Sequence, residues 1–120
     1  MLSPDSAPYR GTPLQAAALK ALVVEEIENM KGRDIVVLDV GGRSSITDCM
    51  VICAGNSKRH VQSIAEHVAT AAKQAGVMPL GVEGGEFGEW VLVDLGNVVV
   101  HVMQEKARDF YQLEKLWGHD

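Results

Sequence analysis

The sequence predicts a single α/β domain, with a mixed sheet of about five strands and three helices. Apolar residues recur at helical spacing in three segments, and short β-branched runs lie between these segments. The clearest pattern is a hairpin over residues 90–103, where two apolar strands flank Gly96-Asn97. The chain has 120 residues, of which 47% are hydrophobic, so it can bury one modest core, and no boundary between domains is visible.

Residues 1–11 are expected to form a flexible tail, and the single domain is expected to span residues 12–118. Thr12 is a candidate N-cap for the first helix, Pro13 suits its first position, and Gln15 completes a capping box. The apolar positions of this helix are Leu19, Leu22, Val23, Ile27 and Met30.

Two strands are predicted next, at residues 34–40 and 48–55. The turn between them is short, which favours an antiparallel pair. A second helix opens at Ser57 and ends at Gly76. Its apolar face consists of Val61, Ile64, Ala65, Val68 and Ala72.

The segment 77–81 reads as a short strand, and Pro79 indicates a place at an edge of the sheet. A strand, a helix and a strand in this order favour a parallel crossover. A last helix is expected over residues 104–118. Its inward residues would be Ala107, Phe110, Leu113, Leu116 and Trp117.

The hairpin has two faces of different character. If Gly96 and Asn97 form the turn, one face pairs only valines and leucines, as a core face should. The other face pairs Asp94 with Val99, Leu92 with His101, and Trp90 with Met103. Two interpretations of this mixed face remain open. Either the last helix covers it and Trp90 belongs to the core, or it is a protein-binding face anchored by Trp90 and Met103.

The stretch "GVEGGEFGEW" at residues 81–90 leads into that hairpin. Glycine-rich loops often bind phosphate, but Glu83, Glu86 and Glu89 would repel an anion. As the rim of a protein-binding face, the three glutamates would suit a basic partner, and glycine would let the loop conform to it.

Candidate sites for catalysis or metal binding are weak. Cys49 and Cys53 read as buried thiols, and the four histidines form no ligand pattern, so neither a metal nor a cofactor is expected. Nucleotidyl transfer needs a pair of carboxylates, and the strand that should supply them has none. The residues therefore favour a non-enzyme, although a nucleotide-binding enzyme using Ser57, Lys58 and Asp94 remains an alternative.

The stretch "AGNSKRH" at residues 54–60 has two interpretations. Free backbone N–H groups beside Lys58 and Arg59 could bind an anion, or Asn56 or Ser57 could simply cap the helix.

The charge and hydropathy of the chain limit its partners. A net charge of −5 argues against broad wrapping of nucleic acid but allows docking on a basic protein. There is no visible signal peptide and no apolar stretch long enough to span a bilayer, so a cytoplasmic protein without membrane association is expected.

Two segments carry a family resemblance: "DIVVLDVGGRSSITDCMVICAGNSKRHVQSIAEHV" and "PLGVEGGEFGEWVLVDLGNVVVHVMQEKARDFYQLEKLW". Together they resemble the Iojap family, whose bacterial members are ribosomal silencing factors, over about residues 14–117. The resemblance implies a nucleotidyltransferase-like fold without its catalytic carboxylates. It also implies binding to the fourteenth protein of the large ribosomal subunit, a block on subunit joining when nutrients are short, and a homodimer when free.

The resemblance also implies partner-binding residues. The matching positions are Gly81, Glu83, Trp90, His101, Met103 and Tyr111, with Lys115 as a further candidate on the last helix. Trp90 is the expected anchor. A role in assembly of the large subunit would use the same docking site, so it remains a second interpretation.

Overall fold

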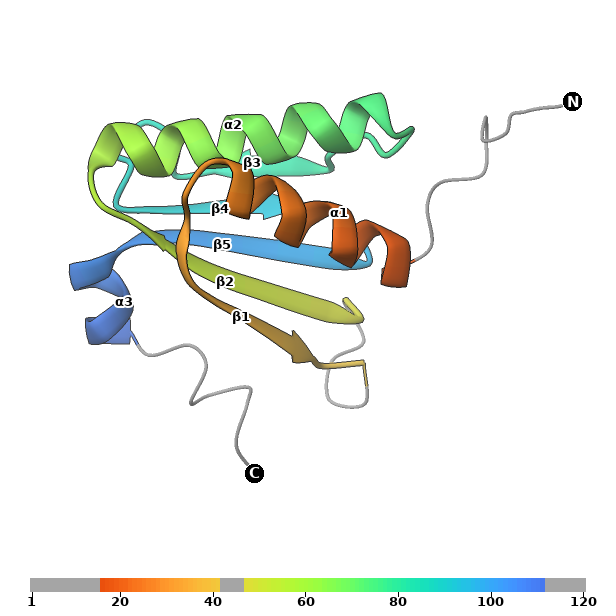
Figure 1. Ribbon diagram of the computed structural model, residues 1–120, viewed down its shortest axis with the longest axis horizontal. Helices are drawn as coiled ribbons and strands as arrows, with labels where there is room; N and C mark the ends of the chain where they lie inside the picture. The colour runs from red at the N-terminus through yellow and green to blue at the C-terminus, as the bar shows by residue number, and fades with distance from the viewer. Residues whose placement is uncertain (1–15, 42–46, 112–120) are drawn as a thin grey trace, which may run out of the picture.

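The computed structural model describes residues 16–41 and 47–111 (Figure 1). The expected tail, the capping box at residues 12–15 and Lys115 lie outside these residues. The elements are α1 (Ala16–Asn29), β1 (Arg33–Asp39), β2 (Cys49–Gly55), α2 (Lys58–Gln74), β3 (Gly81–Glu83), β4 (Trp90–Asp94), β5 (Val98–Gln104) and α3 (Glu105–Tyr111). No helix in the described ranges is long and apolar enough to cross a membrane.

The strands form one mixed five-stranded sheet in the order β1-β2-β5-β4-β3. Strands β2 and β5 are parallel, and the other neighbouring pairs are antiparallel. The mixed α/β fold with three helices is confirmed, as is the antiparallel pairing of the first two strands. The crossover through α2 joins parallel strands, because β2 and β3 run in the same direction with β5 and β4 between them.

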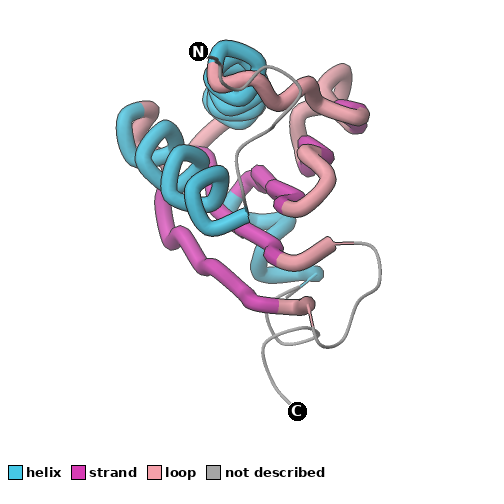
Figure 2. Tube along the Cα trace, turned by 90° about the vertical axis from the view of Figure 1, so that its right-hand side faces the viewer, coloured by secondary structure: helices cyan, strands magenta, loops and turns pink. Residues whose placement is uncertain are grey.

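Helices α1 and α2 pack on one face of the sheet and bury the main core (Figure 2). The predicted apolar face of α2 is confirmed, since all five of its residues are buried. In α1, Leu19, Val23 and Ile27 are buried, and Leu22 and Met30 are partly buried against the same core. The short helix α3 packs on the opposite face through Ala107.

The hairpin has the predicted register. Trp90 pairs with Met103, Leu92 with His101 and Asp94 with Val99. Gly96 has a φ of +88°, which suits the first central position of a two-residue turn, and its N–H donates to Asp94 Oδ1 at 2.9 Å. The all-valine face therefore points to α1 and α2, and the mixed face points the other way.

The predicted strand at residues 77–81 is wrong. The edge strand β3 begins only at Gly81, and the preceding residues end α2 instead. The N–H of Val77 donates to Ala72 O at 2.8 Å and that of Gly76 to Lys73 O at 3.0 Å, the two bonds of a Schellman motif. Val77 is buried because the residue after the left-handed glycine packs back on the helix, so its apolar character does not mark a strand.

Candidate partner-binding face

The mixed face of the sheet divides into a covered part and an open part. Over β2 and β5, a second small core joins Met50, Ile52, Met103 and Ala107 under α3. Over β3 and β4 no described helix covers the sheet. We call this part the open face, and its residues are Gly81, Glu83, Trp90, Leu92 and Asp94. The interpretation that the last helix covers this face therefore holds for the part around Met103. The interpretation as a protein-binding face stays a prediction for the open part.

Trp90 lies at the boundary between the covered and open parts. Its ring is half-buried and packs against the small core. Its Nε1–H donates to Nδ1 of His101 at 3.0 Å, and the two ring centroids are 5.9 Å apart. Beside the indole, Glu83, Gly84 and Leu92 complete a shallow hollow of about 240 Å³. An apolar, partly exposed aromatic whose orientation is fixed by hydrogen bonding is typical of an interface anchor.

His101 acts as the support of Trp90. Only 6% of its surface is exposed, and this burial lowers its pKa to about 4, so the imidazole is neutral at pH 7. Because Nδ1 accepts from Trp90, the proton of the neutral ring lies on Nε2. Among the described residues, Nε2 has no hydrogen-bond partner. His101 therefore orients the indole from below and does not itself reach the surface.

Two glutamine side chains donate hydrogen bonds to the backbone of the acidic loop at residues 84–89. Gln62 of α2 donates to Gly85 O at 2.5 Å, and Gln104 at the end of β5 donates to Gly88 O at 3.0 Å. The expectation that glycine lets this loop adapt to a partner therefore needs correction. Neither glutamine was singled out in the sequence, because nothing local indicates a contact with a loop more than ten residues away.

Two of the three glycines of this loop, Gly84 and Gly88, are required by close packing. Gly84 has a φ of +85°, and a Cβ atom there would lie 2.2 Å from the carbonyl oxygen of Trp90. Gly88 has a φ of +68°, and its Cβ would lie 2.4 Å from Cγ of Lys58. These contacts fix the backbone of the loop at Gly84 and Gly88, directly before β4 begins at Trp90.

The structure brings most of the predicted partner-binding residues together. Gly81 pairs with Asp94 and the exposed Glu83 pairs with Leu92, so both lie on the open face. Glu83 lies beside Trp90, whereas Gly81 lies at the other end of β4. Met103 is fully buried under α3, which makes it a support of this face in this conformation. Tyr111 is the last residue of α3, and its side chain lies outside what the structure describes. Leu92 was not among the predicted residues, although the predicted register already placed it on this face.

The alternative active site is not assembled. Ser57 and Lys58 follow the end of β2, where Gly55 aligns with Gln104 of β5. Asp94 pairs with Val99 at the opposite end of β5. Five residues of strand separate the two places, which is about 16 Å at the usual rise per residue. Asp94 therefore cannot act together with Ser57 and Lys58.

The cysteines and the described histidines form no reactive centre in the part of the chain that the structure describes. Cys49 and Cys53 are free and buried, and burial raises the pKa of Cys53 to about 12, so its thiol stays protonated. Within residues 16–41 and 47–111, no three His, Cys, Asp or Glu side chains could hold a metal ion together.

Comparison with known proteins points to one family. The family model described as ribosomal silencing factor during starvation matches residues 13–120. The ribosomal silencing factor of Haemophilus influenzae is 49% identical over 84% of this chain and 99% of its own length. That of Chromobacterium violaceum is 44% identical over 88% of this chain and 86% of its own.

Solved structures agree with this similarity. The crystal structure of a Chromobacterium violaceum protein superposes with a TM-score of 0.86, at 43% identity over 89% of each chain. A Bacillus halodurans structure gives a TM-score of 0.77 at 40% identity, over 84% of this chain and 94% of the other. A more distant mouse relative, 31% identical over 97% of this chain and 50% of its own length, is named as mitochondrial assembly of ribosomal large subunit protein 1.

Proposed function

This chain belongs to the ribosomal silencing factor family, and on that premise we propose that it binds the large ribosomal subunit and sterically blocks joining with the small subunit. Translation would thereby fall when nutrients are limiting. We further propose that the docking site on the subunit is its fourteenth protein, and that the protein acts in the cytoplasm.

The observation that supports this proposal best is the open face around Trp90. Its hollow is lined by the half-buried Trp90 and Leu92, and α3 covers only the neighbouring strands. Half-buried aromatic residues of this kind contribute much of the binding energy at protein interfaces. Glu83 is exposed on this face, and the exposed Glu86 and Glu89 lie in the loop that leads into Trp90, so a basic protein surface is the complementary partner.

Steric block requires no catalysis, and the chain offers no assembled active site in its described part. Ser57 and Asp94 lie at opposite ends of the sheet. We therefore propose a protein that works without turnover, metal or cofactor. In the free state a homodimer is proposed, as the family resemblance implies, and light scattering of the purified protein measures it directly.

The test of the function uses isolated ribosomal subunits. The protein should sediment with large subunits and not with small ones, and its addition before mixing should lower the amount of joined ribosomes. Sedimentation with large subunits that leaves joining unchanged would contradict the silencing role.

The acidic flank of the face can be tested with one pair of charge variants. Glu83→Lys should weaken binding to large subunits roughly tenfold, because it puts a repelling charge beside a basic partner. Glu66→Lys makes the same change on the exposed side of α2, which packs on the opposite face of the sheet, and should bind normally. Equal affinities of the two variants would rule out the open face as the contact.

The name of the mouse relative favours a second candidate, a role in assembly of the large subunit. An assembly factor would bind immature subunits in preference to mature ones, and its loss would leave incomplete subunits. A silencing factor would bind mature subunits and leave their composition unchanged. Sucrose-gradient profiles of cells with and without the gene separate the two roles.

A further inference from the structure

The exposed positive charges gather at one end of the sheet. Of the seven exposed Lys and Arg residues in the described ranges, five lie where β1 begins and β2 and β5 end. They are Lys31, Arg33, Lys58, Arg59 and Lys106. This concentration stands out in a chain with a net charge of −5.

A hollow of about 710 Å³ opens among these cations. Lys31 follows α1, Arg33 begins β1, and Arg59 lies in the first turn of α2, so three separate segments supply its positive charge. Asn56 and Ser57 add polar groups to the lining, and no carboxylate is among the lining residues. The lining therefore offers positive charge and hydrogen-bond donors, and the one carboxylate that pairs with a lining cation, Glu105 with Arg33, is not itself part of the lining.

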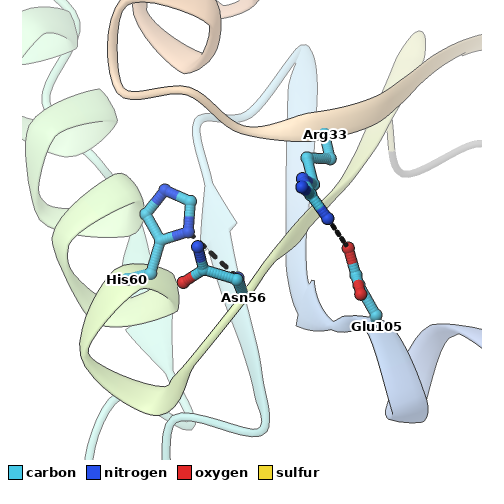
Figure 3. Close-up of polar contacts among 4 residues, drawn as sticks. All are labelled: Arg33, Asn56, His60 and Glu105. Atoms are coloured by element: carbon cyan, nitrogen blue, oxygen red, sulfur yellow. Dashed lines mark hydrogen bonds and ion pairs between the residues drawn. The ribbon is translucent and has the colours of Figure 1, made fainter.

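The fold holds this hollow in shape through His60. Its Nδ1 accepts from the N–H of Asn56 at 3.0 Å (Figure 3). Its Nε2 lies 2.8 Å from Met30 O. The ring is thus in the Nε2–H form and joins the end of α1 to the start of α2. Lys31 has a φ of +63°, which turns the chain sharply from α1 into the hollow.

Arg33 forms an exposed ion pair with Glu105. Its Nη1 lies 2.7 Å from Glu105 Oε2, and the two side chains are 60% and 46% exposed (Figure 3). Exposed pairs of this kind contribute little to stability. Arg33 can therefore leave Glu105 and bind a phosphate with little loss of folding stability.

We propose that this basic hollow binds a backbone phosphate of RNA. A single nucleotide fits it less well, because the hollow has no free aromatic ring on which a base could stack and no carboxylate pair for a bound metal. Cations spread over five positions suit successive phosphates of a polynucleotide backbone. Such contacts fix a protein on RNA without reading its sequence.

The location of the hollow relative to Trp90 extends the proposed function, on which this step rests. Arg33 pairs with Ala54, Ala54 with Met103, and Met103 with Trp90, so one row across the sheet leads from the hollow to the anchor. Three strand spacings separate Arg33 from Trp90, about 14 Å. A ribosomal surface made of protein and RNA can therefore contact both at once.

The test removes two charges from the hollow and compares salt dependence. Lys31→Asn combined with Arg59→Gln removes two lining cations, and asparagine tolerates the left-handed backbone of Lys31. Lys20→Gln with Lys73→Gln changes the net charge equally, away from the hollow. The probes are isolated large subunits, a 20-base-pair RNA duplex of arbitrary sequence, and ATP with Mg²⁺.

Removing the hollow's cations should weaken binding to large subunits roughly tenfold at low salt, and should reduce the slope of log affinity against log salt by roughly 1.5 to 2. The same variant should lose weak binding to the duplex, whereas the control double variant and Trp90→Ala should keep it. Equal slopes for the two double variants would overturn the proposal. Saturable ATP binding that depends on Lys31 and Arg59 would also overturn it, in favour of a mononucleotide site. If duplex binding behaves as expected while large subunits are not bound, the proposed function fails and the RNA site stands.

Discussion

At the scale of single residues, Trp90 is held from three directions. The buried His101 accepts its N–H, the small core under α3 packs against one side of the ring, and Gly84 lies against its carbonyl oxygen. An aromatic side chain fixed in this way loses little conformational freedom when a partner covers it. More of the contact energy is then available for binding.

The buried imidazole predicts a pH dependence of stability. The pKa of His101 is about 4 in the folded protein, against 6.5 when the chain is unfolded. The unfolded state therefore binds more protons between these values, and stability falls as the pH decreases from about 6.5 to about 4. The loss should reach about 3 kcal/mol at the lower end. His101→Gln keeps an acceptor for Trp90 but does not titrate, so its melting temperature should fall less over this range. An equal fall of melting temperature with pH in the unsubstituted protein and in His101→Gln would contradict this role of His101.

Part of the site at this scale could be predicted from the sequence. Strand alternation alone places Trp90, Leu92 and His101 on one face, because the register of a two-residue hairpin is set by its turn. The burial of Met103 could not be predicted, since alternation does not say which part of a face a helix covers. The bond from Trp90 to His101 depends on ring orientations that only the packed structure determines.

At the scale of elements, the loop from Gly84 to Glu89 links three parts of the fold. It is bonded to α2 through Gln62, to the end of β5 through Gln104, and it leads directly into Trp90. The glycine pattern indicated a loop correctly. The hydrogen bonds that hold the loop come from residues distant in the sequence, which no local pattern reveals.

Two neighbouring glycines of this loop should respond very differently to substitution. Gly84→Ala should lower the free energy of unfolding by about 2–4 kcal/mol, because the new Cβ meets the Trp90 carbonyl and the φ of +85° disfavours alanine. Gly85→Ala places its Cβ in open space and should change stability by less than about 0.5 kcal/mol. Denaturant unfolding of the two variants measures the difference. A Gly84→Ala variant as stable as Gly85→Ala would mean that the backbone at Gly84 can move away from the Trp90 carbonyl without loss of stability.

The elements themselves were predictable where periodicity is strong. The stripe of α2 and the valine face of the hairpin follow directly from residue spacing. The strand predicted at residues 77–81 was wrong because Val77 and Leu80 do not belong to one strand, although both are apolar. Val77 packs back on α2 as part of its C-terminal motif, and Leu80 is 74% exposed.

At the scale of the whole molecule, the main core and the proposed docking face lie on opposite faces of the sheet. The main core lies under α1 and α2, and the open face lies on the other side. Substitutions on the open face should therefore change binding more than folding. The basic hollow and the acidic residues around Glu83 place positive and negative charge at the same end of the molecule. This combination suits a partner surface composed of RNA and basic protein.

Removing residues 1–11 should leave both folding and ribosome binding unchanged. The domain is expected to start at the capping box predicted at residues 12–15, and the first described helix begins at Ala16. Circular dichroism and sedimentation with large subunits measure the two properties. A truncated protein that folds but no longer sediments with large subunits would show that the N-terminal segment contributes to docking.

The most direct test of the central claim measures Trp90→Ala twice, by thermal melting and by affinity for isolated large subunits. Because the ring is half-buried, the substitution should cost about 1–3 kcal/mol of stability, and it should weaken binding roughly 30- to 1000-fold. Val68→Ala, in the core under α2, should cost a similar amount of stability and leave binding unchanged at temperatures where both variants are folded. Lost binding for Trp90→Ala alone would support docking through the open face. Unchanged affinity of a folded Trp90→Ala protein, or equal losses for both variants, would contradict it.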